Sequence, residues 1–215
     1  MAAETHRSVA ESLERTPIIG VVRTGDRAEA EAQARELIAA GVELVEITFS
    51  CPDATEIVTE LLAERGPEGP PWIGMGTVTR ADRARRALAA GAEFIVTPNA
   101  NAETAAVATE AGVFLVVGAL TPTEIVAARE MGADYVKVYP LAPVGGPAYL
   151  ATVRQPLSDV PCLAAGGFPP GEIPAYRQAG ARAYGIAAPL LGAGGDGGVD
   201  AVRRAIGLAR GEEPA

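Results

Sequence analysis

Residues 94–117 read FIVTPNANAETAAVATEAGVFLVV, and this stretch contains the unit from which the chain is built. A short apolar run at 94–97 comes first, and an alanine-rich stretch with helical periodicity at 102–111 follows it. Gly112 ends the predicted helix, because glycine readily adopts the left-handed backbone conformation that closes helices. A second apolar run begins at Phe114. The stretch therefore predicts a strand, a helix and another strand.

The same unit repeats along the whole chain. The apolar runs predict eight strands, near residues 18–22, 44–48, 72–75, 94–97, 114–117, 135–139, 162–164 and 183–186. Helical patterns lie between them at 27–40, 54–64, 80–90, 102–111 and 122–131, and many end on a glycine, namely Gly41, Gly91, Gly112, Gly132 and Gly180.

Eight such units of about 25 residues predict an α/β fold, the (β/α)₈ or TIM barrel, at the compact end of its size range. We expect one domain over residues 1–215, with a short N-terminal helix at about 5–14 and the barrel at about 17–210. A doubly wound open sheet is the main alternative. It is disfavoured because no Gly-x-Gly-x-x-Gly follows the first predicted strand.

Composition restricts the partners of the protein. The 215 residues are 48% hydrophobic, which is enough for one well-buried core. The formal net charge is -9 and the pI is near 4.7, so neither a nucleic acid nor an anionic membrane is expected as a partner. The sequence shows no signal peptide and no apolar stretch of membrane-spanning length, which predicts a cytoplasmic protein.

Two residue types narrow the chemistry. His6 is the only histidine and precedes the first predicted strand, so histidine-based catalysis and histidine-ligated metal sites are not expected. Cys51 and Cys162 lie far apart with no CxxC pattern, which predicts free thiols and no zinc cluster. Lysine, carboxylate, arginine, threonine and tyrosine side chains remain as candidates.

Lys137 is the most informative of these candidates. It lies in the run Tyr-Val-Lys-Val-Tyr-Pro, residues 135–140, in which its neighbours are apolar or aromatic. Burying a charged amine without a partner costs several kcal/mol, so this side chain is expected to be either paired or partly neutral. A neutral lysine is a nucleophile. The run therefore predicts a lysine with a chemical role.

The alternation of side chains along the predicted strands indicates which residues lie near Lys137. Side chains alternate across a strand, so Lys137 and Glu46, on the second predicted strand, should both point into the barrel. The same alternation places Arg23 just past the first strand, and Thr77, in phase with Met75, just past the third. Functional groups of such barrels collect at the carboxyl ends of the strands. We therefore expect four polar side chains at one barrel mouth.

With these residues in place, the chain resembles the KDPG/KHG aldolases, Schiff-base enzymes that cleave 2-keto-3-deoxy-6-phosphogluconate and 4-hydroxy-2-oxoglutarate. The resemblance runs from about residue 17 to residue 191 and keeps the order of the motifs. They are Glu46-Ile47-Thr48-Phe49, Gly74-Met75-Gly76-Thr77-Val78, Phe94-Ile95-Val96-Thr97-Pro98, Gly118 with Thr121-Pro122-Thr123-Glu124, Lys137 with Tyr139-Pro140, and Gly166-Gly167.

The resemblance implies a class I aldolase, a lyase that reversibly cleaves a 2-keto-4-hydroxy acid to pyruvate and an aldehyde. Lys137 would form the Schiff base, and Glu46 would move protons as the general acid and base. Arg23 would hold the pyruvyl carboxylate, and Thr77 would donate a hydrogen bond to the same carboxylate or to the ketone oxygen. No cofactor or metal is implied, because the lysine iminium is the electron sink.

Other family features follow from the same resemblance. Pro98 would line the substrate site, and the backbone amides of Gly166 and Gly167 would face the far end of the substrate. The resemblance also implies a homotrimer. A sugar-phosphate isomerase or synthase on a similar small barrel, or a non-catalytic relative, remains an alternative.

The sequence departs from the family at its phosphate site. Family members that bind phosphate usually have threonine before the Gly-Gly turn and Gly-Ser after the eighth strand, but here these positions are Ala165, Ala187 and Ala188. Two hydroxyl donors are therefore missing. We expect an aldehyde product that is small or unphosphorylated, such as glyoxylate.

Overall fold

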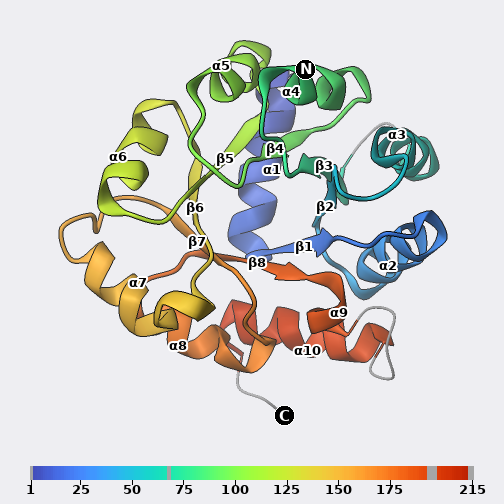
Figure 1. Ribbon diagram of the computed structural model, residues 1–215. Helices are drawn as coiled ribbons and strands as arrows, with labels where there is room; N and C mark the ends of the chain where they lie inside the picture. Colours follow the sequence, from blue (N-terminus) through green and yellow to red (C-terminus); the bar gives the residue numbers. More distant parts are fainter. Residues whose placement is uncertain (1, 67–68, 193–197, 213–215) are drawn as a thin grey trace.

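The computed structural model describes residues 2–66, 69–192 and 198–212, and in them eight parallel strands close into a barrel in sequence order (Figure 1). β1 pairs with β8, which completes the ring. The strands are β1 (Ile18–Val22), β2 (Leu44–Thr48), β3 (Trp72–Gly76), β4 (Phe94–Val96), β5 (Phe114–Ala119), β6 (Tyr135–Val138), β7 (Cys162–Ala165) and β8 (Ala183–Ala187). The predicted single-domain (β/α)₈ fold is confirmed, whereas its extent over residues 1–215 stays a prediction.

Helices surround the strands, and one helix lies across the ring (Figure 1). They are α1 (Ala2–Arg15), α2 (Arg27–Ala40), α3 (Ala54–Arg65), α4 (Ala81–Ala89), α5 (Ala102–Ala111), α6 (Pro122–Glu130), α7 (Gly146–Arg154), α8 (Ile173–Gln178), α9 (Ala188–Leu191) and α10 (Gly198–Arg210), with short 3₁₀ helices η1 (Ala142–Val144) and η2 (Pro170–Glu172). Gly41 and Gly112 end α2 and α5 at φ 94° and 68°, in the left-handed conformation that the sequence predicts.

Strand alternation divides the core into two layers. Ile19, Leu44 and Phe94 belong to a cluster inside the barrel, whereas Ile18 and Val45 pack between the strands and the helices. The inward positions of each strand therefore face one another across the barrel. Polar residues at these positions share a confined interior.

α1 closes one end of that interior. Val9 and Leu13 are fully buried among the inward-facing side chains, and the indole nitrogen of Trp72 donates a hydrogen bond to the Ser12 hydroxyl at 2.9 Å. His6 lies on the same helix, 2.9 Å from an Asp134 carboxylate oxygen. This helix, Ala2–Arg15, is longer than the predicted 5–14 at both ends, and the additional residues are exposed.

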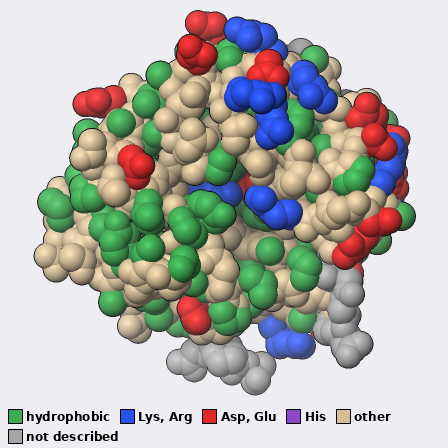
Figure 2. Space-filling view, in the orientation of Figure 1, with side chains coloured by type: hydrophobic (Ala, Val, Ile, Leu, Met, Phe, Trp, Pro, Cys, Tyr) green, Lys and Arg blue, Asp and Glu red, His purple; other side chains and the backbone are tan. Residues whose placement is uncertain are grey.

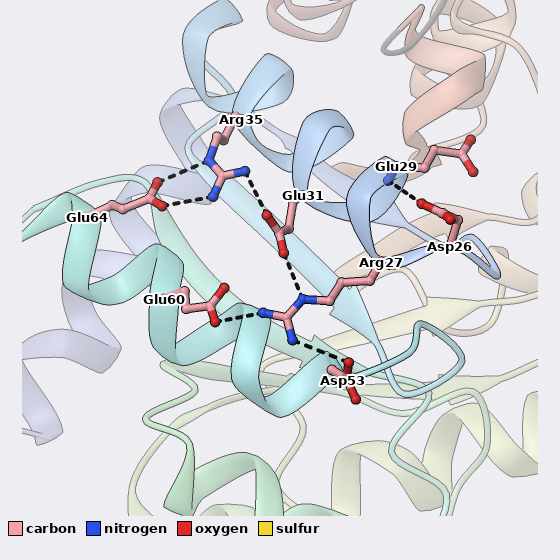
Figure 3. A network of polar contacts seen from close by, with 8 residues as sticks. All are labelled: Asp26, Arg27, Glu29, Glu31, Arg35, Asp53, Glu60 and Glu64. Atoms are coloured by element: carbon pink, nitrogen blue, oxygen red, sulfur yellow. Dashed lines mark hydrogen bonds and ion pairs between the residues drawn. The ribbon is translucent and has the colours of Figure 1, made fainter.

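An ion-pair network joins α2 to α3 (Figure 3). Arg27 donates to Glu60 at 2.7 Å and Arg35 to Glu64 at 2.8 Å, and both arginines also donate to Glu31. Hydrogen bonds from Arg27 and then Arg35 hold the pKa of the Glu31 carboxyl below its usual range. Exposed pairs of this kind contribute little individually, so the network mainly sets how the two helices lie against each other.

The two cysteines behave as the sequence predicts. Cys51 and Cys162 are free and buried, and burial raises the pKa of the Cys162 thiol. Across residues 2–66, 69–192 and 198–212, no helix has the length and apolar character needed to cross a membrane.

The closing role of α1 generates a stability prediction. Leu13→Ala should lower the free energy of unfolding by about 2–5 kcal/mol, because it leaves a cavity in a closed barrel end. Leu190→Ala is the matched control, since Leu190 is 43% exposed. Urea denaturation of both variants measures the difference. Equal losses of unfolding free energy would mean that α1 does not contribute to the core.

Candidate active site

Lys137 and Glu46 meet inside the barrel. The Lys137 Nζ lies 3.6 Å from Glu46 Oε2, and the two side chains are only 9% and 1% exposed. Both point inward, as strand alternation predicts. The same Nζ lies 5.8 Å from the centroid of the Tyr139 ring, which adds a cation–π contact. The predicted amine is therefore paired with a carboxylate, which offsets the cost of burying it.

Glu46 keeps one oxygen free. Its Oε1 is buried and has no hydrogen-bond partner among the described residues. Buried carboxylate oxygens usually have a partner, so this atom is a ready acceptor for a water molecule or a substrate hydroxyl. Gly76 provides the space, because a Cβ atom there would lie 1.8 Å from Oε1.

Glycines also make room around Lys137. Gly118 pairs with Lys137 in the β5–β6 register, and a Cβ on Gly118 would lie 2.2 Å from the Pro98 carbonyl carbon. On the other side, a Cβ on Gly185 would lie 4.0 Å from Lys137 Cε. Pro98 thus forms a wall of the interior close to Lys137. Sequence reasoning gave no role to Gly76, Gly118 or Gly185, although glycine at inward strand positions signals a close approach.

Arg23 and Thr77 lie together at the mouth. An Arg23 Nη2 hydrogen bond reaches the Thr77 hydroxyl oxygen at 3.1 Å. The predicted reason for the position of Thr77 is wrong, however, because Met75 packs in the outer layer and Gly76 faces inward. Thr77 has a left-handed backbone, φ 57°, which interrupts the alternation after β3. This turn, and not the phase of the strand, brings Thr77 to Arg23.

The turn after β7 contains the two predicted glycines. Gly166 has φ 111°, and a Cβ there would lie 2.6 Å from Pro140 Cα, so the turn packs directly against the segment after β6. Gly167 has φ 83° and open space beside it. Ala165 faces the barrel interior, and Ala187 ends β8 opposite Val21 of β1. These two side chains bring methyl groups, and no hydroxyl, to this side of the mouth.

One side of the mouth lacks charged side chains. Figure 2 shows a hollow at the centre of this face, with arginine side chains over α4 and hydrophobic side chains over α7 and α8. The segments after β6, β7 and β8, at 139–147, 165–171 and 187–192, have no charged side chain. Arg23, which follows β1, contributes a cation at the mouth and reaches Thr77 after β3.

The comparisons with known proteins agree with this geometry. A family model described as KDPG and KHG aldolase matches residues 9–203. The chain belongs to the KDPG and KHG aldolase family. It is 33% identical to 2-dehydro-3-deoxy-phosphogluconate aldolase of Treponema pallidum (strain Nichols) over 160 residues, covering 74% of this chain and 75% of that protein.

Two further matches cover more of the chain. The 2-dehydro-3-deoxy-6-phosphogalactonate aldolase of Escherichia coli (strain K12) is 30% identical over 179 residues, or 83% of this chain and 86% of that protein. A solved structure described as native KDPGal has a TM-score of 0.77 and 29% identity, covering 90% of this chain and 92% of that one. The resemblance inferred from the motifs is confirmed. This member of the KDPG and KHG aldolase family is an enzyme of the lyase class.

The contact between Gly76 and Glu46 generates a prediction for this aldolase. Gly76→Ala should displace the Glu46 carboxylate and lower the rate of aldol cleavage roughly 10²-fold, as a misplacement of about 1 Å can do. Gly171→Ala is the control, because a Cβ there meets nothing within 4 Å. Cleavage is followed as release of pyruvate. A Gly76→Ala enzyme with the rate of the control would show that Glu46 does not need its present position.

Proposed function

We propose that this protein is a class I aldolase that cleaves a 2-keto-4-hydroxy acid to pyruvate and an aldehyde, with Lys137 as the Schiff-base residue. The observation that carries the proposal is the buried contact between Lys137 Nζ and Glu46 Oε2 at 3.6 Å. A nucleophilic amine next to a proton-transferring carboxylate, inside a largely closed interior, is the pair of groups that Schiff-base chemistry needs.

The proposed reaction begins when Lys137 transfers a proton to Glu46 and the resulting neutral amine attacks the ketone carbon, C2, while one of its N–H protons moves to the ketone oxygen. The carbinolamine that forms loses water, with Glu46 supplying the proton for the leaving hydroxyl, and an iminium results. Glu46 then accepts the proton of the C4 hydroxyl, the C3–C4 bond breaks, and its electron pair moves to the iminium nitrogen. The products are an aldehyde and a Lys137-bound enamine. Glu46 returns the proton to C3, and hydrolysis of the new iminium releases pyruvate and frees Lys137.

Arg23 and Thr77 are proposed to bind the carboxylate of the keto acid. The Thr77 hydroxyl accepts a hydrogen bond from Arg23, so its own proton is free to be donated to the substrate. A guanidinium is well suited to a carboxylate, because its donors match both oxygens. This grip would place C2 of the substrate towards Lys137 and C4 towards the opposite side of the mouth.

At the far end of the substrate we propose a small or unphosphorylated group. The two curated relatives are named for phosphorylated sugar acids. In this chain Ala165, Ala187 and Ala188 provide no hydroxyl, and the backbone amides of Gly166 and Gly167 are the donors that we assign to this end. A phosphate carries about −1.5 to −2 charge at pH 7 and needs more donors than the single charge of a carboxylate. Glyoxylate, which has a carboxylate and no phosphate, is the aldehyde product that fits this smaller number of hydrogen-bond donors.

The oligomeric state and the cellular location are proposed from the sequence and from the family resemblance. We propose a homotrimer, which light scattering on the purified protein would test, and a cytoplasmic location. The competing proposal is a sugar-phosphate isomerase or synthase. An aldolase forms a lysine adduct with pyruvate and these enzymes do not, so the adduct distinguishes them.

Lys137 is the only lysine in the sequence, which makes a trapping experiment unusually clean. With pyruvate and sodium borohydride, the wild-type protein should gain one reduced pyruvyl adduct on the Lys137 peptide, as shown by mass spectrometry. Lys137→Arg keeps a cation near Glu46 but cannot form an imine, so this variant should gain none there. An isomerase, a synthase or an inactive relative would give no adduct, and an equal adduct in Lys137→Arg would exclude Lys137.

The far end of the substrate gives a separate prediction. The value of kcat/KM should be higher for 4-hydroxy-2-oxoglutarate than for 2-keto-3-deoxy-6-phosphogluconate. Ala165→Thr should raise kcat/KM about tenfold for the phosphorylated substrate alone, since a hydrogen bond to a charged group contributes about 1.5–3 kcal/mol. Coupled assays of pyruvate release compare the two substrates. Equal or better turnover of the phosphorylated substrate by the wild-type enzyme would rule out this preference.

A further inference from the structure

Thr77 adopts a backbone conformation that needs support. Its φ of 57° lies in the left-handed region, and Asp53, at φ 50°, is the other non-glycine residue with positive φ among those described. A β-branched residue in this region is unusual, because its side chain crowds the backbone. Such strain costs about 1–3 kcal/mol and persists only where surrounding contacts hold it.

Contacts on both sides of Thr77 fix the turn. The Gly76 carbonyl accepts a hydrogen bond from the Phe49 amide at 2.9 Å, and the Val78 amide donates to the Val96 carbonyl at 3.3 Å. Val78 is also fully buried. Phe49, directly after β2, and Val96, in β4, therefore hold the residues before and after Thr77.

Arg83, on α4, holds Thr77 itself. Its Nη1 donates to the Thr77 carbonyl oxygen at 3.1 Å and lies 3.4 Å from the Thr79 hydroxyl. The guanidinium carbon of Arg83 lies 5.3 Å from the centroid of the Phe49 ring, so the side chain is also fixed by a cation–π contact. Arg83 thus fixes the carbonyl of the strained residue from outside the barrel.

The other side of Thr77 faces the mouth. Its hydroxyl accepts the hydrogen bond from Arg23 Nη2 at 3.1 Å. Thr77 therefore contacts two arginines. Its carbonyl oxygen binds Arg83 on α4, and its hydroxyl binds Arg23 after β1. We propose that Arg83 is a positioning residue, which holds Thr77 in its left-handed conformation so that Arg23 is aimed at the substrate carboxylate. This inference rests on the proposed function of Arg23.

The binding step of pyruvate tests the inference. In the borohydride experiment, Arg83→Leu should raise the pyruvate concentration for half-maximal labelling of Lys137 about tenfold, the effect of losing one hydrogen bond to a charged group. The maximal labelling should be unchanged, because Lys137 and Glu46 keep their contact. Arg83→Lys should recover at least half of the loss, since an ammonium can still donate to the Thr77 carbonyl.

Arg86 provides the matched control. Its guanidinium carbon lies 5.4 Å from the same Phe49 ring, yet among the described residues it makes no hydrogen bond to Thr77. Arg86→Leu should therefore leave half-maximal labelling within twofold of wild type. A change as large as that of Arg83→Leu would show that the ring contact matters and the carbonyl contact does not.

A double variant separates positioning from a general loss of structure. If Arg83 acts through Arg23, then Arg83→Leu adds nothing once Arg23→Leu has been introduced, and the double variant matches Arg23→Leu alone. Two results would overturn the inference. One is a half-maximal pyruvate concentration in the double variant that equals the product of the two single effects, and the other is an unchanged half-maximal concentration in Arg83→Leu. Absence of any adduct in the wild-type protein would instead overturn the proposed function, so the two failures are distinguishable.

Discussion

A lysine and a glutamate share the interior of the barrel, and their burial constrains the residues around them. Neither charge could lie there alone, because water is largely excluded and an unpaired ion would be strongly destabilising. Their contact of 3.6 Å needs an interior wide enough for two polar side chains. Gly76, Gly118 and Gly185 face inward at this level and provide that width. The α1 helix closes the other end, so the interior opens only where a substrate would enter.

Much of this fold could be predicted from the sequence, because its signals are local and repeated. The apolar runs at 18–22 and 44–48 are observed strands with the same bounds, and the helices at 27–40 and 102–111 also match. The inward direction of Lys137 and Glu46 followed from strand alternation and is confirmed. Both residues lie in the middle of regular strands, where a period of two holds and the barrel decides which face is inside.

The mouth was less predictable, because there the chain leaves regular structure. Thr77 was expected at the mouth in phase with Met75, but Met75 packs in the outer layer. A positive φ, which is rare for threonine and has no signal in composition, is what brings Thr77 to Arg23. The contact of Arg83 with the Thr77 carbonyl depends on where α4 lies relative to the turn after β3. Sequence spacing alone does not contain that packing. Loop conformation and contacts between elements therefore came from the structure, and the identity of the polar residues came from the sequence.

We propose that Lys137 and Glu46 act together on the three-carbon part of the substrate. Proton NMR of pyruvate in deuterated buffer tests this claim most directly, because an enamine on Lys137 exchanges the methyl protons of pyruvate for deuterium. We expect exchange by the wild-type protein, none by Lys137→Arg, and a rate lowered by about 10²–10⁴-fold in Glu46→Gln, the usual contribution of a general acid or base. Undiminished exchange by Glu46→Gln, or exchange that survives in Lys137→Arg, would contradict this proposal.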